Sequence, residues 1–130
     1  MTNEERDLLL RDLCGRLHTF LYVNIKGNIQ VLNSWADDDG NFFNFLDDGP
    51  DGNYGEGFTL DDVKPYLRPM SSMTGKEAIE WHETTFGQRW ITFDNVERCV
   101  DWLNAHHIDY RGLIEKGLAL EAPKDMYKTE

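Results

Sequence analysis

The amino-acid sequence predicts an α+β fold: an N-terminal helix, a small antiparallel sheet of 3–5 strands, and two helices of the C-terminal half packed on that sheet. Residues 3–17 and 94–107 carry apolar side chains at helical spacing. Residues 20–46 hold three runs rich in β-branched and aromatic side chains, separated by turn residues. A length of 130 residues suits one domain with its own core, so residues 1–130 are expected to form a single compact domain.

The first helix is expected over residues 3–17. Thr2 or Asn3 can accept a hydrogen bond from a free amide of its first turn, and acidic residues follow, which suits the positive end of the helix dipole. Its apolar stripe comprises Leu10, Leu13, Cys14 and Leu17.

The sheet is expected from residues 20–25, 29–35 and 41–46. Lys26-Gly27-Asn28 supplies a turn between the first two strands, which favours a hairpin. Residues 58–63 are read as a fourth strand or an irregular edge.

The two prolines of residues 64–69 exclude a regular helix there and predict an extended connector across the sheet. Thr74 and Glu77 form a capping box, which predicts a helix from Thr74 to about Thr85, broken by Gly87.

Residues 90–93 alternate and predict a short strand before the last helix. Asp94 is expected to cap that helix, with Glu97 completing an acidic capping box. Its apolar stripe comprises Val96, Cys99, Val100, Leu103 and His107.

Asp109 is expected to cap one further helical turn over residues 110–116, which Gly117 would end. Residues 118–122 are expected to be a strand or an extended docking segment.

Charge restricts the partners. The chain has a formal net charge of −11, and nine acidic residues but no Lys, Arg or His lie between Lys26 and Lys64. Such a chain is not expected to bind nucleic acid or an anionic membrane, because both need cationic groups. No apolar run is long enough for a membrane helix, and the N-terminus lacks a signal-peptide pattern, which predicts a cytoplasmic protein with free Cys14 and Cys99.

No motif predicts an enzyme, a metal or a cofactor. His82-Glu83-Thr84-Thr85-Phe86 begins like the zinc motif H-E-x-x-H but has Phe where the second ligand is required. His106 and His107 are adjacent, so on a helix they point about 100° apart and are poorly placed to share one ion. An enzyme with a site built from His82, His107 and a carboxylate stays open as a further hypothesis.

Two groups of residues are candidate sites. An acidic face can occupy a basic groove on another protein by charge complementarity. Arginines combined with aromatic side chains suit contacts to anions and stacking on a planar ligand. The acidic face comprises Asp37, Asp38, Asp39, Asp47, Asp48 and Asp51. The candidate ligand-binding group comprises Tyr66, Arg68, Trp102, His107, Tyr110 and Arg111. The alternative interpretation is that the aspartates only solvate a loop, that both arginines pair with local acids, and that the aromatic residues are core.

The strings VKPYLRPMSSMT (residues 63–74), DWLNAHHIDYRGLIEKGLALEAP (101–123) and LLLRDLCGRL (8–17) resemble a small uncharacterised family of gut Bacteroides-type bacteria, their phages and mobile elements. The chain departs from the family at residues 18–21, His-Thr-Phe-Leu in place of Pro-Tyr-Gly-Val, and at Gly75-Lys76 in place of an acidic run. The resemblance implies a bacterial or phage intracellular setting and no activity.

The leading functional hypothesis is a non-enzymatic, acidic binding protein of phage or mobile-element type, which acts by protein–protein contact and inhibits a host (defence) factor. The alternative is a protein that binds or sequesters a small ligand such as a nucleotide signal. With four tryptophans in an acidic domain, a homo-oligomer also stays open.

Overall fold

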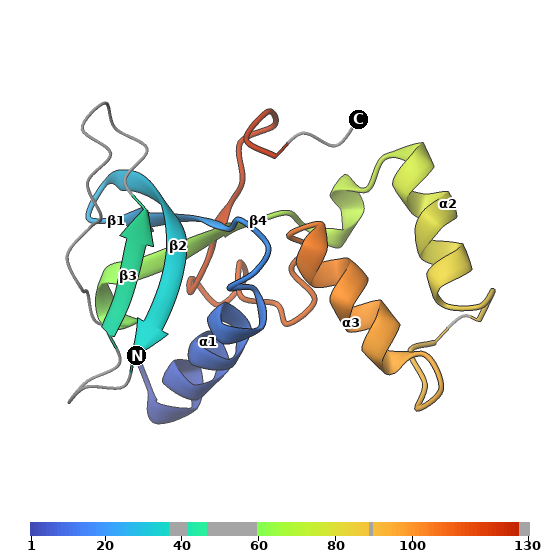
Figure 1. Ribbon diagram of the computed structural model, residues 1–130, viewed down its shortest axis with the longest axis horizontal. Helices are drawn as coiled ribbons and strands as arrows, with labels where there is room; N and C mark the ends of the chain where they lie inside the picture. The colour runs from blue at the N-terminus through green and yellow to red at the C-terminus, as the bar shows by residue number, and fades with distance from the viewer. Residues whose placement is uncertain (37–41, 47–59, 89, 128–130) are drawn as a thin grey trace.

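The computed structural model describes residues 1–36, 42–46, 60–88 and 90–127. The order of its elements confirms the α+β class (Figure 1). They are α1 (Asn3–Gly15), β1 (Tyr22–Ile25), β2 (Asn28–Ala36), β3 (Phe42–Leu46), the 3-10 turn η1 (Leu60–Asp62), β4 (Val63–Leu67), the 3-10 turn η2 (Met70–Ser72), α2 (Gly75–Thr84), α3 (Val96–Ala105) and β5 (Leu120–Glu121).

The sheet has the strand order β3-β2-β1-β4-β5. The pairs β1–β2, β1–β4 and β2–β3 are antiparallel, as expected, whereas the short β5 runs parallel to β4. The sheet is therefore mixed, because β4 and β5 are joined by the long segment that contains α2 and α3 instead of by a hairpin.

The β1–β2 hairpin turns on two residues, Lys26 and Gly27. Both have positive φ, 52° and 92°, which is the backbone of a type I′ turn and matches the twist of the flanking strands. The Asn24 side-chain oxygen accepts a hydrogen bond from the Gly27 amide at 3.0 Å, and Ile25 pairs with Asn28. The predicted hairpin is therefore confirmed, but its connection is two residues long because Asn28 already belongs to β2.

The predicted connector at residues 64–69 is largely strand, which corrects that expectation. Pro65 lies in β4 opposite Val23 of β1. Proline has no amide hydrogen to donate, but β5 begins only opposite Tyr66, so no ladder bond to β5 is lost at Pro65.

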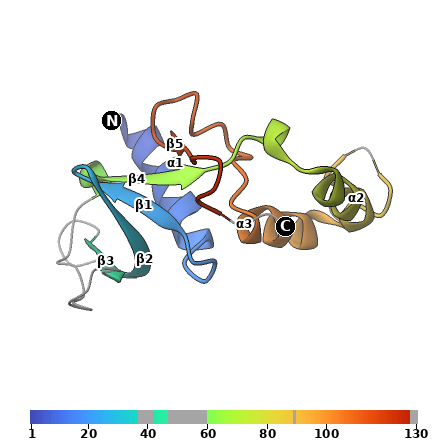
Figure 2. The ribbon, with the colours of Figure 1, turned by 90° about the horizontal axis from the view of Figure 1, so that it is seen from above.

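Helix α1 covers one face of the sheet (Figure 2). Its first turn has the capping box of Thr2 and Glu5, in which each side chain bonds the other residue's amide. Leu9 and Leu13 of α1 are buried against side chains of β1, β4 and the segment that follows α3. The core consists mainly of Leu9, Leu13, Leu21, Val23, Ile25, Leu32, Leu60, Val63, Leu67, Leu113, Leu118, Ala119 and Tyr127.

Helices α2 and α3 pack on each other beside the sheet, not across its face (Figures 1 and 2). The Trp81 and Trp102 rings meet between them at 5.3 Å, and Cys99 lies buried against the Thr84 carbonyl. The sequence predicted both helices but placed them on the sheet, because helical periodicity shows which face is apolar and not what covers it.

The segment that contains α2 and α3 begins and ends at neighbouring positions. The Arg68 amide donates to the His107 carbonyl, and the Asp109 amide donates to the Arg68 carbonyl, both at 2.8 Å. These bonds make a parallel bridge between Arg68 and Ile108. Residues 69–107 therefore leave the sheet and return to the place where they left it.

The expected strand at residues 90–93 does not form. The Asn95 side chain organises this segment as a turn, because its amide donates to the carbonyls of Thr85 and Trp90 and its oxygen accepts from the Thr92 amide. Asn95, not Asp94, is the N-cap residue of α3, and it makes no side-chain capping bond. The prediction of an Asp94 cap was wrong.

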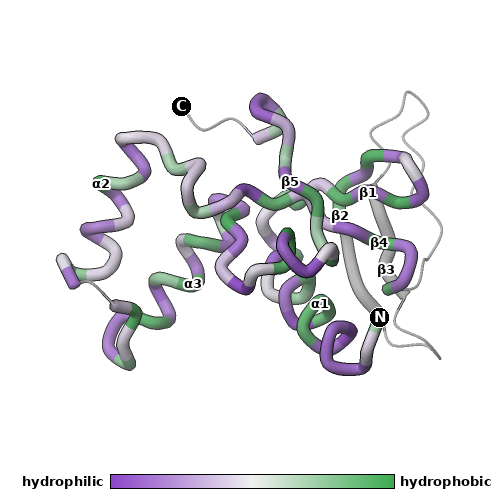
Figure 3. Tube along the Cα trace, turned by 180° about the vertical axis from the view of Figure 1, so that it is seen from behind, coloured by the Kyte–Doolittle hydropathy of each residue, from purple (hydrophilic) through white to green (hydrophobic). Residues whose placement is uncertain are grey.

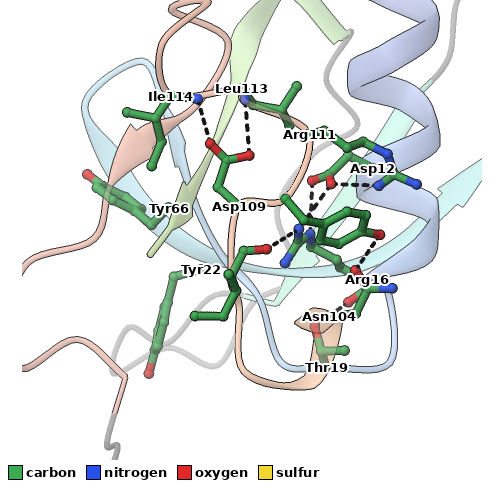
Figure 4. Close-up of polar contacts among 12 residues, drawn as sticks. Asp12, Arg16, Thr19, Tyr22, Tyr66, Asn104, Asp109, Arg111, Leu113 and Ile114 are labelled. Carbon is green, nitrogen blue, oxygen red and sulfur yellow. Dashed lines mark hydrogen bonds and ion pairs between the residues drawn. The ribbon is translucent and has the colours of Figure 1, made fainter. Parts of the chain in front are cut away.

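The expected helix over residues 110–116 is a series of turns. Its predicted anchor is present, since the Asp109 carboxylate accepts from the amides of Leu113 and Ile114, both at 3.0 Å (Figure 4). Gly117 ends the segment at φ 74°, as expected. Residues 118–122 contain β5, which agrees with the strand that was one of the two predictions for this segment.

Candidate functional site

We call the sheet together with α1 the sheet unit, and α2 with α3 the helix pair. A cleft of about 470 Å³ lies where the two meet. Its lining includes Phe20, Tyr22, Lys76, Glu80, His106, His107 and Tyr127. Phe20 follows α1, and Tyr22 belongs to β1. Lys76 and Glu80 come from α2, the two histidines follow α3, and Tyr127 comes from the C-terminal segment.

The inner wall of the cleft is stabilised by the ion pair of Arg68 and Glu77. Arg68 Nη2 lies 2.6 Å from Oε1 of Glu77, and Nη1 lies 2.9 Å from Oε2. Both side chains are buried, and the guanidinium also donates to the Ser72 and His106 carbonyls. The Arg68 bonds lower the pKa of Glu77 to about 2, so its carboxylate stays ionised.

Glu77 has a second task. Its carboxylate accepts from the Thr74 amide at 3.0 Å and thereby completes the predicted capping box of α2. One carboxylate therefore starts the helix and fixes Arg68 at the end of β4, so the pair sets the position of α2 relative to the sheet.

His106 and His107 follow α3 and differ in environment. His106 stacks on Trp102 at 3.9 Å and its Nδ1 lies 2.8 Å from the Trp102 carbonyl. Since a carbonyl only accepts, Nδ1 carries the hydrogen, and in the neutral ring Nε2 is an acceptor. His107 is buried and stacks on Tyr127 at 3.8 Å, and its Nδ1 has no hydrogen-bond partner among the described residues.

Burial lowers the pKa of His107 to about 4, and the neighbouring charges of Arg16 and Arg68 act in the same direction. The ring is therefore neutral at neutral pH. Its backbone has φ 59°, because His107 is the left-handed residue of a Schellman motif: the Ile108 amide bonds the Leu103 carbonyl at 2.9 Å. Glycine is the usual residue at this place.

Tyr127 closes the cleft and ties three segments together. Its hydroxyl donates to the Tyr66 carbonyl at 2.8 Å and accepts from the Tyr22 amide at 2.9 Å. Burial raises the pKa of Tyr127 well above its usual range, so the hydroxyl remains a donor.

A second buried network lies under α1 (Figure 4). The Asp12 carboxylate accepts from Nε of Arg16 at 2.9 Å and from Nη1 of Arg111 at 2.8 Å. Asp12 and Arg16 are fully buried, and Arg16 also donates to the Ile108 carbonyl at 2.7 Å. The Tyr110 ring lies between the two guanidinium groups, 5.3 and 4.7 Å from their carbon atoms. This network joins α1 to the segment after α3.

Exposed apolar side chains gather at the outer end of the helix pair. We call this the tip surface: Phe86, Trp90, Ile91, Phe93 and Val96. The Phe93 side chain is 96% exposed and that of Trp90 is 68% exposed. The chain just before α3 is partly coloured as hydrophobic in Figure 3, far from the sheet. The turn held by Asn95 directs these side chains outward.

Acidic residues border the tip surface. A shallow hollow of about 250 Å³ beside it is lined by Asp94, Glu97, Arg98 and Asp101. The Arg98 guanidinium lies 4.1 Å from the centre of the Phe86 ring and so covers one face of it. The border has three carboxylates for one guanidinium, so it is negative.

The structure separates the six residues of the candidate ligand-binding group. Arg68 and His107 line the cleft, whereas Tyr110 and Arg111 belong to the Asp12 network. Tyr66 accepts from the Asn24 side chain at 3.0 Å on the sheet, and Trp102 packs between α2 and α3. Arg68 and Arg111 are both paired with carboxylates.

The predicted acidic face, Asp37 to Asp39, Asp47, Asp48 and Asp51, lies outside the described residues. The cleft lining includes His107 but not His82, so it does not unite the two histidines of the enzyme hypothesis. Within residues 1–36, 42–46, 60–88 and 90–127, no three His, Cys, Asp or Glu side chains are grouped so that they could hold a metal ion. In the same residues no helix is long and apolar enough to cross a membrane.

Sequence reasoning missed Phe20, Lys76, Glu80 and Tyr127 as cleft residues and the whole tip surface. These four residues come from three segments that are far apart in the sequence, so no spacing links them. The tip surface had a local signal, a run with Trp90, Ile91 and Phe93 next to a helix start, but alternation was interpreted as a buried strand.

Comparison of the chain with models of protein families, with curated proteins and with solved structures found no match.

Proposed function

We propose that this chain is a non-enzymatic binding protein that docks on another protein through its tip surface. The observation that carries the proposal is the exposure of five large apolar side chains on residues 86–96, with Phe93 almost entirely in solvent. Exposed apolar groups of this size that are adjacent, rather than scattered, are typical of surfaces that bind other molecules. Trp and Phe are also the side chains that contribute most at the centre of interfaces.

The charges around the tip surface favour a partner with a basic surface. Asp94, Glu97 and Asp101 border it, and the whole chain carries a net charge of −11. A negative border repels phosphates of nucleic acid and of anionic lipids. It complements a protein with an apolar groove bordered by Lys and Arg, and like charges would suppress docking on acidic proteins.

The backbone at Phe86 supports the same interpretation. Helix α2 ends in a Schellman motif, with the Gly87 amide on the His82 carbonyl at 2.8 Å, and Phe86 occupies its left-handed position at φ 60°. A glycine there would avoid about 1 kcal/mol of backbone strain. A phenylalanine that is 55% exposed recovers little of this cost by burial in the monomer. Arg98 covers one face of the ring, and the exposed remainder is available to a partner.

The resemblance at residues 63–74 and 101–123 to a family of bacterial, phage and mobile-element proteins makes a host-cell factor the first partner to test. Inhibition of that factor would follow if its basic groove is the part that does its work, since the acidic tip would occupy it.

The test is affinity capture from host lysate with the natural chain, the double variant Trp90→Ser/Phe93→Ser and the control Ile79→Ser. Ile79 is 64% exposed, close to the 68% of Trp90, but lies on α2, outside the tip surface. We expect a basic protein that is captured by the natural chain and the control and lost with the double variant. Reconstitution from purified components then gives the affinity and its weakening by salt.

Three outcomes would contradict the proposal: no protein captured, equal capture by the double variant, or a salt-independent complex. Self-association of the chain through the same five residues, seen by sedimentation and abolished in the double variant, would identify a second copy as the occupant instead and would overturn the partner class.

A further inference from the structure

We propose that the cleft between the sheet unit and the helix pair binds a planar nitrogen heterocycle without a phosphate group, as a free base or a nucleoside. This inference is independent of the tip surface, because the cleft is lined by Phe20, Lys76, Glu80, His106 and Tyr127 and by no tip residue. Its volume of about 470 Å³ lies within the range of small-molecule sites, roughly 300–1,000 Å³.

The walls of the cleft offer aromatic faces. Phe20 and Tyr22 meet edge to face at 5.9 Å, whereas His107 and Tyr127 stack on each other at 3.8 Å and are buried, so the face that a ligand can reach is that of Phe20. Phe20 is 57% exposed although it is aromatic, so one of its sides is available to a ligand. Stacking on such faces favours a flat ring and does not depend on its substituents.

The polar groups of the cleft require hydrogen-bond donors and acceptors on that ring. Lys76 provides an ammonium donor and Glu80 a carboxylate acceptor, both from the first turns of α2. The Nδ1 of His106 is bound to the Trp102 carbonyl, which leaves Nε2 as the ring nitrogen that can meet a ligand. A nucleobase carries donors and acceptors side by side on its edges and matches this mixture.

A buried nitrogen without a partner is the second observation that points to a ligand. His107 lines the cleft and is 8% exposed, and its Nδ1 has no hydrogen-bond partner among the described residues. A buried polar atom in this state costs about 1–3 kcal/mol, so it is usually satisfied by something that the bare chain lacks.

The backbone adds a third observation. Four described residues other than glycine have positive φ, and two of them, Phe20 and His107, line the cleft, both at 59°. Strain of this kind is concentrated at ligand sites, where a particular side chain must be presented. At His107, moreover, glycine would be the favoured residue of the helix end.

The charges of the cleft argue against a phosphate. Arg68 has its guanidinium on Glu77 and on two carbonyl groups, so it is not free to bind an anion. The remaining cation, Lys76, is opposed by Glu80, and His107 is neutral at neutral pH. A phosphate would therefore meet as many negative as positive charges, whereas an uncharged base would not be repelled.

The test is saturation-transfer NMR and calorimetry on the full chain with adenine, adenosine, guanosine, cytidine and uridine as probes, and AMP as the phosphate-bearing probe. At least one base or nucleoside is expected to bind saturably, with stronger transfer to ring protons than to ribose protons. AMP is expected to bind roughly tenfold more weakly than adenosine, because its phosphate would lose hydration without gaining a net positive partner.

The variants Lys76→Ala, Glu80→Gln and His107→Gly each remove one proposed contact, and Glu83→Ala, on the same helix but outside the cleft lining, is the matched control. Glycine suits φ 59°, so the third variant keeps the helix end. Loss of affinity in these variants but not in the control supports the site. No saturable binding by any base or nucleoside, AMP binding as tightly as adenosine, or affinity unchanged in all three variants would each overturn it.

Discussion

Arg68 and Glu77 make a two-point ion pair, 2.6 and 2.9 Å between their nitrogen and oxygen atoms, that fastens the first turn of α2 to the end of β4. Because the pair is buried, removal of either side chain would leave the other charge without a partner and would destabilise the fold. The same carboxylate caps α2, so the loss of Glu77 would remove both the ion pair and the helix cap.

Glu77→Ala is expected to lower the free energy of unfolding by about 3–5 kcal/mol, because Arg68 would be left buried without its counter-charge. Urea denaturation followed by circular dichroism measures the change. Glu80→Ala on the same helix removes a side chain that makes no ion pair with another described residue, so this variant is expected to stay within about 0.5 kcal/mol of the natural chain. Equal losses in the two variants would show that the ion pair is not the cause.

Asp12 serves two guanidinium groups, whereas Arg111 has one carboxylate and is 20% exposed. Asp12→Ala should therefore be more destabilising than Arg111→Ala by roughly 2 kcal/mol or more, since it strands the fully buried Arg16. The denaturant midpoints of the two variants show which loses more stability, provided that the free energy of unfolding depends on denaturant concentration with the same slope in both. A larger loss for Arg111→Ala would show that the cation–π contacts of Tyr110 dominate the network.

The left-handed position at Phe86 gives a matched pair of substitutions. Phe86→Gly and Phe86→Ala remove the same ring, but only glycine relieves the backbone at φ 60°. The glycine variant is expected to be more stable than the alanine variant by about 1 kcal/mol, and both are expected to lose the proposed contact with a partner. Thermal unfolding gives the stability difference. Equal stabilities would mean that the helix end relaxes to another conformation.

Acid should destabilise the fold through His107. Its folded-state pKa of about 4 lies below its usual 6.5, so between these values the unfolded chain binds the proton and the folded chain does not. The contribution is complete above pH 6.5 and falls by up to about 3 kcal/mol as pH falls to about 4. The groups around the ring are Arg16, Arg68, His106 and Tyr127, and the three side chains that carry positive charge at low pH oppose its protonation.

Urea titrations from about pH 7 to about pH 4 on the natural chain and on His107→Asn measure this dependence. Asparagine tolerates the left-handed backbone and does not titrate, so the variant is expected to lose less stability over that range. Glu77, with a pKa of about 2 against its usual 4.5, adds acid lability below pH 4.5 in both proteins. Parallel pH curves for the two proteins would exclude His107 as the source.

Local signals in the sequence predicted local structure. The helix cap at Thr2, the capping box at Thr74 and the turn at Lys26-Gly27 formed because their bonds join residues three or fewer apart. The segment at residues 90–93 was misjudged because alternating apolar residues on an exposed turn have the same pattern as a half-buried strand. The end of α3 was placed too late, since His107 occupies the position where a glycine would have marked it.

The cleft was out of reach for a different reason. Its walls come from residues as far apart as Phe20, Lys76 and Tyr127, and only the packing of the helix pair beside the sheet brings them together. The arginines were the most attractive ligand groups in the sequence, but burial opposite Glu77 and Asp12 gives them structural partners. A list of residue types does not show which charges are already neutralised.

The bridge between Arg68 and Ile108 has a consequence for how this chain can vary and be engineered. A stretch whose two ends already touch behaves as a cassette, but an exchange of residues 69–107 has to keep Glu77 or replace Arg68 as well, because the two buried charges pair across the junction. With Arg68→Leu, a short Gly-rich link from residue 68 to Ile108 should yield a miniature sheet protein, and the excised helix pair could be transplanted to a scaffold with the same narrow spacing.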